Sequence, residues 1–285
     1  MARLLFWLSF VFWAGMTAWL VERDILAPRR SSSDPRYYRD RFEGRTFPMR
    51  ATYELAVGGS AVGNAVVSGS RAGSGAVTWT TEMSLDLVSL VRTQAPALSR
   101  AAQDAPAANL RIEVFLTPRM VFEQARLHVE AGPFRERFRI LPVGDRLTVR
   151  GGETMRSLAG TDTLSVPFDP RAVLDIGVLP LDTGGGLAVG QSWTCHTLDP
   201  LRLRIEPVQV TVVERRAREI WAGGIAGTAF DLRWGRADDP MAPRTVVDGE
   251  GRVLRHEHGP MMIELLSYEE GAAAEVLPPV AEEPD

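Results

Sequence analysis

The residues most suggestive of chemistry are His256-Glu257-His258, near the end of the chain. Two histidines at positions i and i+2 of a strand lie on the same face, and imidazole is a common ligand of zinc. A zinc site needs a third protein ligand as well, usually supported by further hydrogen bonds. The chain has two other histidines, His128 and His196, so a metal site requires one of them to lie beside the pair.

A hairpin accounts for the same stretch without any metal. Asp248-Gly249 lies between alternating apolar residues, which is a strong signal for a tight turn between antiparallel strands. The returning strand then runs through Val253 and Leu254 and ends at His258, before Gly259-Pro260. We therefore predict a hairpin here and assign no metal ion and no cofactor to the chain.

Asp182 belongs to a second motif that suggests chemistry. Leu181-Asp182-Thr183-Gly184 resembles the active-site loop of aspartic peptidases, in which two such carboxylates share a proton. This chain has one copy, so a peptidase of that kind would have to be a symmetric dimer. Because a motif of this length often matches by chance, we interpret it as a glycine-rich loop, with a hydrolase as the alternative.

Cys195 is the single cysteine of the chain. One cysteine rules out an internal disulfide and any zinc or iron–sulfur site built from several thiolates. Its neighbour His196 would point to the opposite face of a strand, so it cannot act as the base for this thiol. We predict that Cys195 is a small buried side chain, and we assign no catalytic residue.

The composition excludes several classes of protein. The 285 residues include 32 basic ones, and all of these are arginine. A phosphate-binding P-loop, a Schiff base and a Ser-Lys dyad each need a lysine, so these chemistries are excluded and no nucleotide is expected. Residues 51–285 carry 23 arginines against 31 acidic residues, a balance that gives no electrostatic footprint for nucleic acid.

The elements that must position these residues are strands, within one domain over residues 51–268. Residues 51–70 predict two strands joined by a turn at Gly58-Gly59. Residues 76–91 alternate between apolar and polar side chains, which is the period of a half-buried strand. Short strands at close spacing with glycine turns predict a mainly β fold. We expect this fold to be either a single antiparallel curved sheet that forms a half-barrel, or a sandwich.

Two segments depart from the strand pattern. Residues 91–109 are rich in alanine and proline and predict a short helix or a long loop. Residues 169–191 begin like a helix, with Asp169 as the N-terminal cap and Pro170 at the first helical position.

The predicted N-terminal signal anchor, residues 1–21, contains an uncharged segment, residues 4–21, that is long enough to cross a bilayer as a helix. No small-x-small cleavage site follows it, so a retained anchor fits better than a cleaved signal peptide. Residues 22–50 mix arginines, serines and prolines, and predict a juxtamembrane linker that is either solvated or in contact with lipid headgroups. Residues 269–285 predict a disordered acidic tail.

Two signals for the membrane orientation disagree. Arg23, Arg29 and Arg30 follow the span and Arg3 precedes it, which favours a cytoplasmic body by the positive-inside rule. A very short N-terminal tail before one large C-terminal domain favours translocation of that domain, because long domains cross largely regardless of charge. We expect a single-pass protein of the bacterial inner membrane whose body lies in the periplasm.

Three longer segments carry a family resemblance. They are YELAVGGSAVGNA (residues 53–65), PFDPRAVLDIGVLPLDTGGGLAVGQSW (167–193) and FDLRWGRADDPMAPRTVVDGEGRVLR (230–255). With them, the body resembles an uncharacterised family of bacterial cell-envelope β-proteins, a domain of unknown function. That family is related to β-modules that precede transglutaminase-like domains. The resemblance implies a curved antiparallel sheet or half-barrel, similar to the lipoprotein-carrier scaffold, and implies no reaction and no catalytic residues.

Together these features predict a non-enzymatic, membrane-tethered β-domain of the envelope that binds a partner protein or a lipid-like ligand. The bilayer is a partner through residues 4–21, and nucleic acid is not expected. The alternative is an envelope hydrolase, either of the aspartic type through Asp182 or metal-dependent through His256 and His258.

Overall fold

The computed structural model describes residues 37–42, 44–89, 107–151, 163–176, 179–180, 182–199, 204–220, 226–235 and 242–271. The predicted anchor, residues 1–21, lies outside these ranges, as do residues 272–285 of the predicted tail. Within the described ranges, no helix is both long enough and apolar enough to cross a membrane.

The named elements are a five-residue helix and fifteen strands. The helix is α3 (Tyr38–Phe42). The first strands are β1 (Met49–Val57), β2 (Ser60–Arg71), β3 (Val77–Asp86), β4 (Ala107–Leu116), β5 (Phe122–Ala131), β6 (Phe134–Val143), β7 (Arg146–Arg150) and β8 (Thr163–Pro167). The others are β9 (Leu174–Ile176), β10 (Ser192–Asp199), β11 (Arg204–Ile220), β12 (Ala226–Trp234), β13 (Arg244–Asp248), β14 (Val253–His258) and β15 (Met261–Glu270).

All fifteen strands form one sheet, in the order β8-β7-β6-β5-β4-β3-β2-β1-β15-β14-β13-β12-β11-β10-β9. The predicted mainly β fold in a single sheet is therefore confirmed, and the sandwich alternative is wrong. The prediction of a purely antiparallel sheet is also wrong, because β9 pairs with β10 in the parallel direction. Strands β1 and β15 pair along their whole length, which joins the two ends of the described chain.

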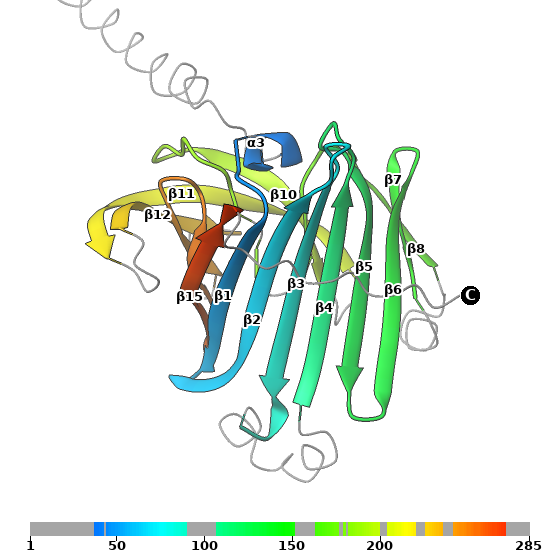
Figure 1. Cartoon of the computed structure of the whole chain (residues 1–285), viewed down its shortest axis with the longest axis horizontal. Helices are drawn as coiled ribbons and strands as arrows, with labels where there is room; N and C mark the ends of the chain where they lie inside the picture. The colour runs from blue at the N-terminus through cyan, green and yellow to red at the C-terminus, as the bar shows by residue number, and fades with distance from the viewer. Residues whose placement is uncertain are drawn as a thin grey trace, which may run out of the picture.

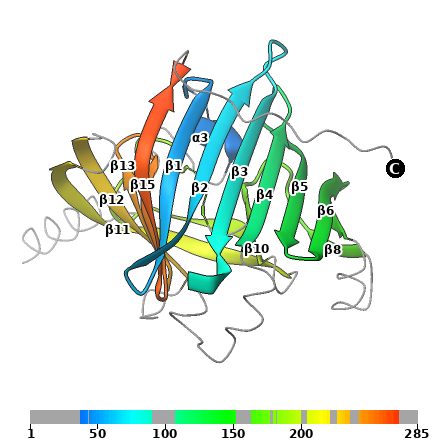
Figure 2. The same cartoon turned by 60° about the horizontal axis from the view of Figure 1, so that its bottom comes forward.

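The sheet curls around its own apolar face into an open, barrel-like layer (Figure 1). In Figure 2, β10 and β11 pass behind β1 to β5, so the two halves of the sheet face each other. Strand β6 shows the cause: Phe138 and Ile140 are buried, while Arg137 and Arg139, which alternate with them, are exposed. Because successive side chains point to opposite faces and strands twist, burying one face of a long sheet bends it around a core.

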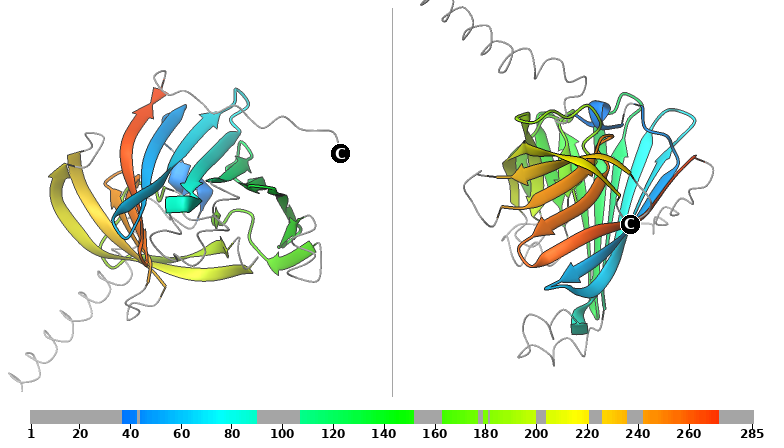
Figure 3. Two further views of the ribbon diagram at one scale, coloured as in Figure 1. Left: turned by 90° about the horizontal axis from the view of Figure 1, so that it is seen from below. Right: turned by 90° about the vertical axis from the view of Figure 1, so that its left-hand side faces the viewer.

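Helix α3 lies inside the curled sheet (Figure 3, left). Tyr38 and Phe42 are completely buried, and their rings are nearly parallel, with centroids 6.3 Å apart. The Phe42 ring lies 5.0 Å from that of Trp79 on β3, and the Tyr38 ring lies 6.3 Å from that of Phe122 on β5. These aromatic contacts fill the interior between the strands, and α3 acts as part of the core.

Two sequence predictions need correction here. The predicted linker, residues 22–50, overlaps this core, because the chain from Tyr37 onward already packs into the domain. The predicted helix after Asp169 is absent: Asp169 Oδ1 accepts a hydrogen bond from the Arg171 amide, 3.0 Å away, in a turn that leads into β9. The Asp169 side chain does accept a backbone hydrogen bond, as a helix cap would, but a tight turn supplies such a donor as well as a helix does.

Both predicted hairpins are confirmed, at Gly58-Gly59 between β1 and β2 and at Asp248-Gly249 between β13 and β14. The hairpin at Asp248-Gly249 packs against the glycine-rich loop. Gly251 has a φ of +78°, and a Cβ there would lie 2.0 Å from the carbonyl oxygen of Gly184. The Thr183 amide donates to the Gly251 carbonyl oxygen at 2.8 Å, so the loop and the hairpin lie backbone to backbone.

Gly251→Ala tests this close approach, with Gly190→Ala as the matched control. Both glycines have positive φ, but a Cβ on Gly190 would meet no atom within 4 Å. Backbone strain alone costs about 1 kcal/mol, so we expect Gly190→Ala to lower the free energy of unfolding by that amount. Gly251→Ala should cost at least about 2 kcal/mol more, because backbone must move as well. Urea unfolding followed by circular dichroism measures both, and equal losses would contradict the close packing.

Candidate functional site

Two arginines on α3 and the turn after it reach two buried aspartates. Arg41 Nη1 lies 3.6 Å from Asp175 Oδ1, and Arg45 Nη2 lies 3.4 Å from Asp182 Oδ2. The four side chains are at most 8% exposed. Arg41 also donates to the carbonyl oxygen of Asp182 at 3.4 Å. We call Arg41, Arg45, Asp175 and Asp182 the clamp, because they tie residues 37–45 to the sheet and to the glycine-rich loop.

Asp182 is fully engaged in this clamp. Its Oδ1 accepts a hydrogen bond from the Val253 amide at 3.0 Å, and its side chain is 6% exposed. Burial raises the pKa of the Asp182 carboxyl, although Arg45 and the Val253 amide both act to lower that pKa. An aspartic peptidase needs a carboxylate that faces its substrate and shares a proton with a second one. The structure instead gives Asp182 an arginine partner inside the fold.

His256 points into the core. Trp234 Nε1 donates to Thr245 Oγ1 at 2.8 Å, and that oxygen lies 2.8 Å from His256 Nδ1. Having accepted from Trp234, the threonine hydroxyl is able to donate its own proton to a neutral imidazole. Burial, assisted by His258, lowers the pKa of His256 to about 4. His256 is therefore a neutral core residue at pH 7.

The structure does not bring the four histidines together. His258 is exposed at the end of β14. His128 lies on β5, and five strands separate it from β14 in the order of the sheet. His196 lies on β10, where its ring meets Phe168 edge to face at 5.4 Å. Among the residues that the structure describes, no group of three or more His, Cys, Asp and Glu side chains is placed to hold a metal ion.

Cys195 lies on β10 and is completely buried. Its thiol lies 3.8 Å from the Val208 carbonyl oxygen on β11, a long contact of the kind a weak S–H donor makes. Burial raises the pKa of the Cys195 thiol, so the reactive thiolate is disfavoured. The thiol behaves as a small core side chain.

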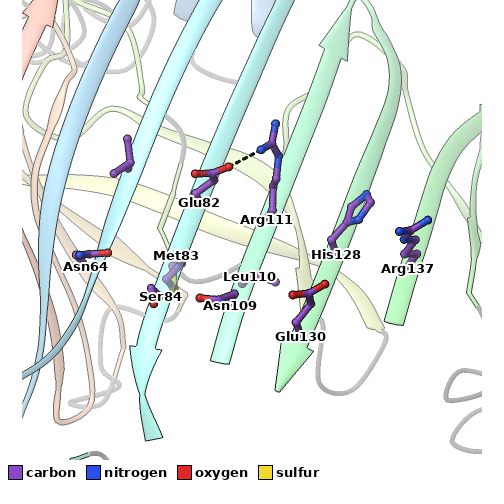
Figure 4. A pocket seen from close by; sticks show the side chains of 11 residues that line it. Asn64, Glu82, Met83, Ser84, Asn109, Leu110, Arg111, His128, Glu130 and Arg137 are labelled. Carbon is purple, nitrogen blue, oxygen red and sulfur yellow. Dashed lines mark hydrogen bonds and ion pairs between the residues drawn. The ribbon is translucent and has the colours of Figure 1, made fainter. Parts of the chain in front are cut away.

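A hollow of about 410 Å³ lies on the opposite, outer face of the sheet, and sequence analysis missed it (Figure 4). It crosses the strands from β2 to β6, and we call it the groove. Its lining residues are Asn64, Val66, Glu82, Met83, Ser84, Asn109, Leu110, Arg111, His128, Glu130 and Arg137.

The register of the sheet explains how the groove forms. Glu82, Arg111, His128 and Arg137 lie directly opposite one another on β3, β4, β5 and β6. Asn64, Ser84, Asn109 and Glu130 form a second row on β2 to β5. Each strand thus contributes one or two polar side chains at the strand period. Since five successive strands contribute only one or two of these side chains each, no local motif marks the site.

The groove offers both donors and acceptors. Arg111 donates to Glu82 and, at 2.9 Å, to Glu113, whose side chain is 1% exposed. Partial burial lowers the pKa of His128, and the neighbouring Arg137 lowers that pKa further. His128 is therefore neutral at pH 7, with one nitrogen to donate and one to accept. Such a surface suits hydrogen bonding to a polar partner.

The depressed pKa of His256 predicts a pH dependence of stability. The unfolded histidine binds a proton below about pH 6.5, whereas the folded one resists protonation down to about pH 4. The free energy of unfolding is therefore not reduced by this histidine above pH 6.5. As the pH falls from 6.5 toward 4, the histidine lowers that free energy by about 3 kcal/mol in all. We expect His256→Gln to shrink the difference in unfolding free energy between pH 7 and pH 4.5 by about 2 kcal/mol.

The control for that measurement is His258→Gln, which removes the exposed histidine of the same strand. It should leave the pH dependence of urea unfolding close to that of the parent chain. If His256→Gln and the parent show the same difference between the two pH values, His256 is not the neutral core residue described above.

No family model matches this chain, and no curated protein matches it. A β-barrel-like protein of the domain of unknown function DUF1849, from Brucella abortus, is 11% identical with a TM-score of 0.48, over 80% of this chain and 100% of that one. A DUF1089 family protein from Pseudomonas aeruginosa is 15% identical with a TM-score of 0.37, over 73% and 90% of the two chains. A protein with a YmcC-like fold from Bacteroides fragilis is 5% identical with a TM-score of 0.27, over 79% and 99%. Each similarity concerns the β fold alone.

Proposed function

We propose that this chain is a non-enzymatic, membrane-tethered β-domain of the bacterial envelope that binds a partner protein at the groove. The observation that supports this most is the double row of polar side chains across β2 to β5, continued by Arg137 on β6. The relation to β-modules that precede transglutaminase-like domains remains part of the proposal.

The position of the groove favours recognition of a partner. Strands β2 to β6 are each paired on both sides, so the backbone under the groove is held in place. A rigid surface loses little entropy on binding, and side chains such as Asn109 and His128 then present their polar atoms without rearrangement. A partner with complementary polar groups gains hydrogen bonds at a low ordering cost.

The interior is less suited to a lipid-like ligand. Tyr38, Arg41 and Phe42 are at most 1% exposed and occupy one end of the space inside the curled sheet, beside β3 and β5. A ligand at that end of the interior would have to displace α3 and break the clamp. This favours the partner protein over the ligand-in-barrel form of the proposal.

The rival hydrolase draws little support from the geometry. It would use Asp182 or the pair His256 and His258. Asp182 is held by Arg45 and the Val253 amide, and His256 is held by Thr245. Each of these side chains already has a structural role that explains its burial.

Photo-crosslinking in native membranes tests the proposal. A photoreactive amino acid placed at Asn109 of the full chain should give one discrete, heavier adduct, because Asn109 is exposed within the groove. Ser84→Trp, which fills the groove from the neighbouring strand, should reduce the adduct by at least about tenfold, equivalent to about 1.4 kcal/mol of lost binding.

The matched control places the same photoreactive group at Val213, an exposed residue of β11 that lies outside the groove. We expect no adduct of that mass from Val213. The proposal is wrong if Asn109 gives no adduct, or if the adducts from the two positions are the same and are unaffected by Ser84→Trp.

A further inference from the structure

A dense set of arginines lies beside the groove, on the outer side of β5, β6 and β7. The six residues are Arg126, Arg135, Arg137, Arg139, Arg146 and Arg150, and we call them the arginine face. The same side of these strands carries Glu130, and Glu123 is exposed at the start of β5. The body as a whole is acidic, with 23 arginines against 31 acidic residues after residue 50. The positive charge is therefore concentrated here.

The register places like charges directly opposite each other. Arg126 pairs with Arg139, and Arg139 pairs with Arg150 on the next strand. Like charges in such positions destabilise a sheet. Several of these arginines also have neutral or exposed partners: Arg139 donates to Gln124 at 3.3 Å, and Arg126 lies 5.0 Å from the Phe115 ring centroid. Arg135 lies 3.9 Å from Glu130, with its side chain 78% exposed. An anionic ligand on this face would offset the repulsion between the arginines that lie directly opposite each other.

An exposed apolar side chain lies on the same face. Val143 ends β6, lies directly opposite Arg146 of β7 and is 57% exposed. It is one of the five exposed large hydrophobic side chains among the described residues. An apolar side chain beside exposed arginines matches the chemistry of the bilayer interface, where apolar groups enter the headgroup layer and cations contact phosphates.

We propose that the arginine face docks onto a bilayer surface rich in anionic phospholipid. This inference rests on the proposed membrane tether, because a tethered domain meets that surface at a high effective concentration. Arginine is well suited to this role, since its planar guanidinium binds phosphate oxygens in a bidentate manner. The proposed tether and the exposed Val143 favour a lipid surface over an acidic peptide.

The experiment uses the full chain in lipid nanodiscs and a fluorophore on Thr163→Cys. Thr163 is exposed on β8, directly opposite Arg150, and the native Cys195 is completely buried and stays unlabelled. Nanodiscs of phosphatidylcholine alone are compared with nanodiscs that also contain phosphatidylglycerol, with a quencher on a fraction of the lipid headgroups. Docking predicts that quenching increases with phosphatidylglycerol and is reversed by high salt.

Charge removal identifies the surface. The triple variant Arg135→Gln, Arg139→Gln and Arg150→Gln leaves the groove residues unchanged and should lower the ratio of docked to undocked domain by about a hundredfold. The control triple variant removes the same charge from exposed arginines elsewhere, by Arg119→Gln, Arg171→Gln and Arg215→Gln. It should leave the quenching within about twofold of the parent, since those charges lie away from the lipid.

Three outcomes would overturn the docking proposal. The first is quenching that does not depend on phosphatidylglycerol. The second is an equal loss of quenching in the two triple variants. The third is quenching that appears only in a variant truncated after Gly271. The last outcome would make the acidic segment 272–285 the occupant of the face.

Failure of the tether is recognised separately. A chain that does not insert into nanodiscs refutes the tether, and adding the same labelled variants to vesicles of the same lipids then tests the arginine face directly. Crosslinking at Asn109 is independent of both results, because the triple variant spares the groove.

Discussion

The buried ion pairs of the clamp are the interaction on which the rest of the structure depends. Arg41 and Arg45 come from a short segment before β1, whereas Asp175 and Asp182 come from the opposite half of the chain. Removing one partner from such a pair leaves an uncompensated buried charge, at a cost of about 3–5 kcal/mol. The clamp therefore keeps α3 inside the curled sheet and fixes the packing of the glycine-rich loop against the hairpin after β13. It also occupies Asp182, the carboxylate that most resembled a catalytic one.

Because α3 fills one end of the interior, our proposals place binding on the outer face of β2 to β7. The groove and the arginine face adjoin each other at Arg137, which contributes to both. Under our proposals the arginines hold the domain against anionic lipid, and the groove then presents its polar rows to a partner beside the membrane. Docking on two sites restricts the orientation of the domain, so a partner would meet the groove already positioned.

Sequence patterns predicted the local structure well and the site poorly. The strand period and the turns at Gly58-Gly59 and Asp248-Gly249 depend on neighbouring residues, so they were predicted correctly. Two kinds of feature escaped. The first is the burial of α3, because the aspartates that pair with Arg41 and Arg45 lie more than 130 residues away. Without those partners, a charged segment next to a predicted anchor has the pattern of a linker. The groove is assembled from single residues of separate strands, and the register that aligns them is a property of the whole sheet.

The central claim is that the outer face of β2 to β7 is the working surface of this domain in the membrane. Hydroxyl-radical footprinting tests it most directly, by comparing the side-chain reactivity of the full chain in native membranes with that of the purified chain. We expect His128 and Val143 to be protected in membranes, while the exposed Val213 on β11 reacts equally in both states. Equal reactivity of all three residues in the two states would contradict it.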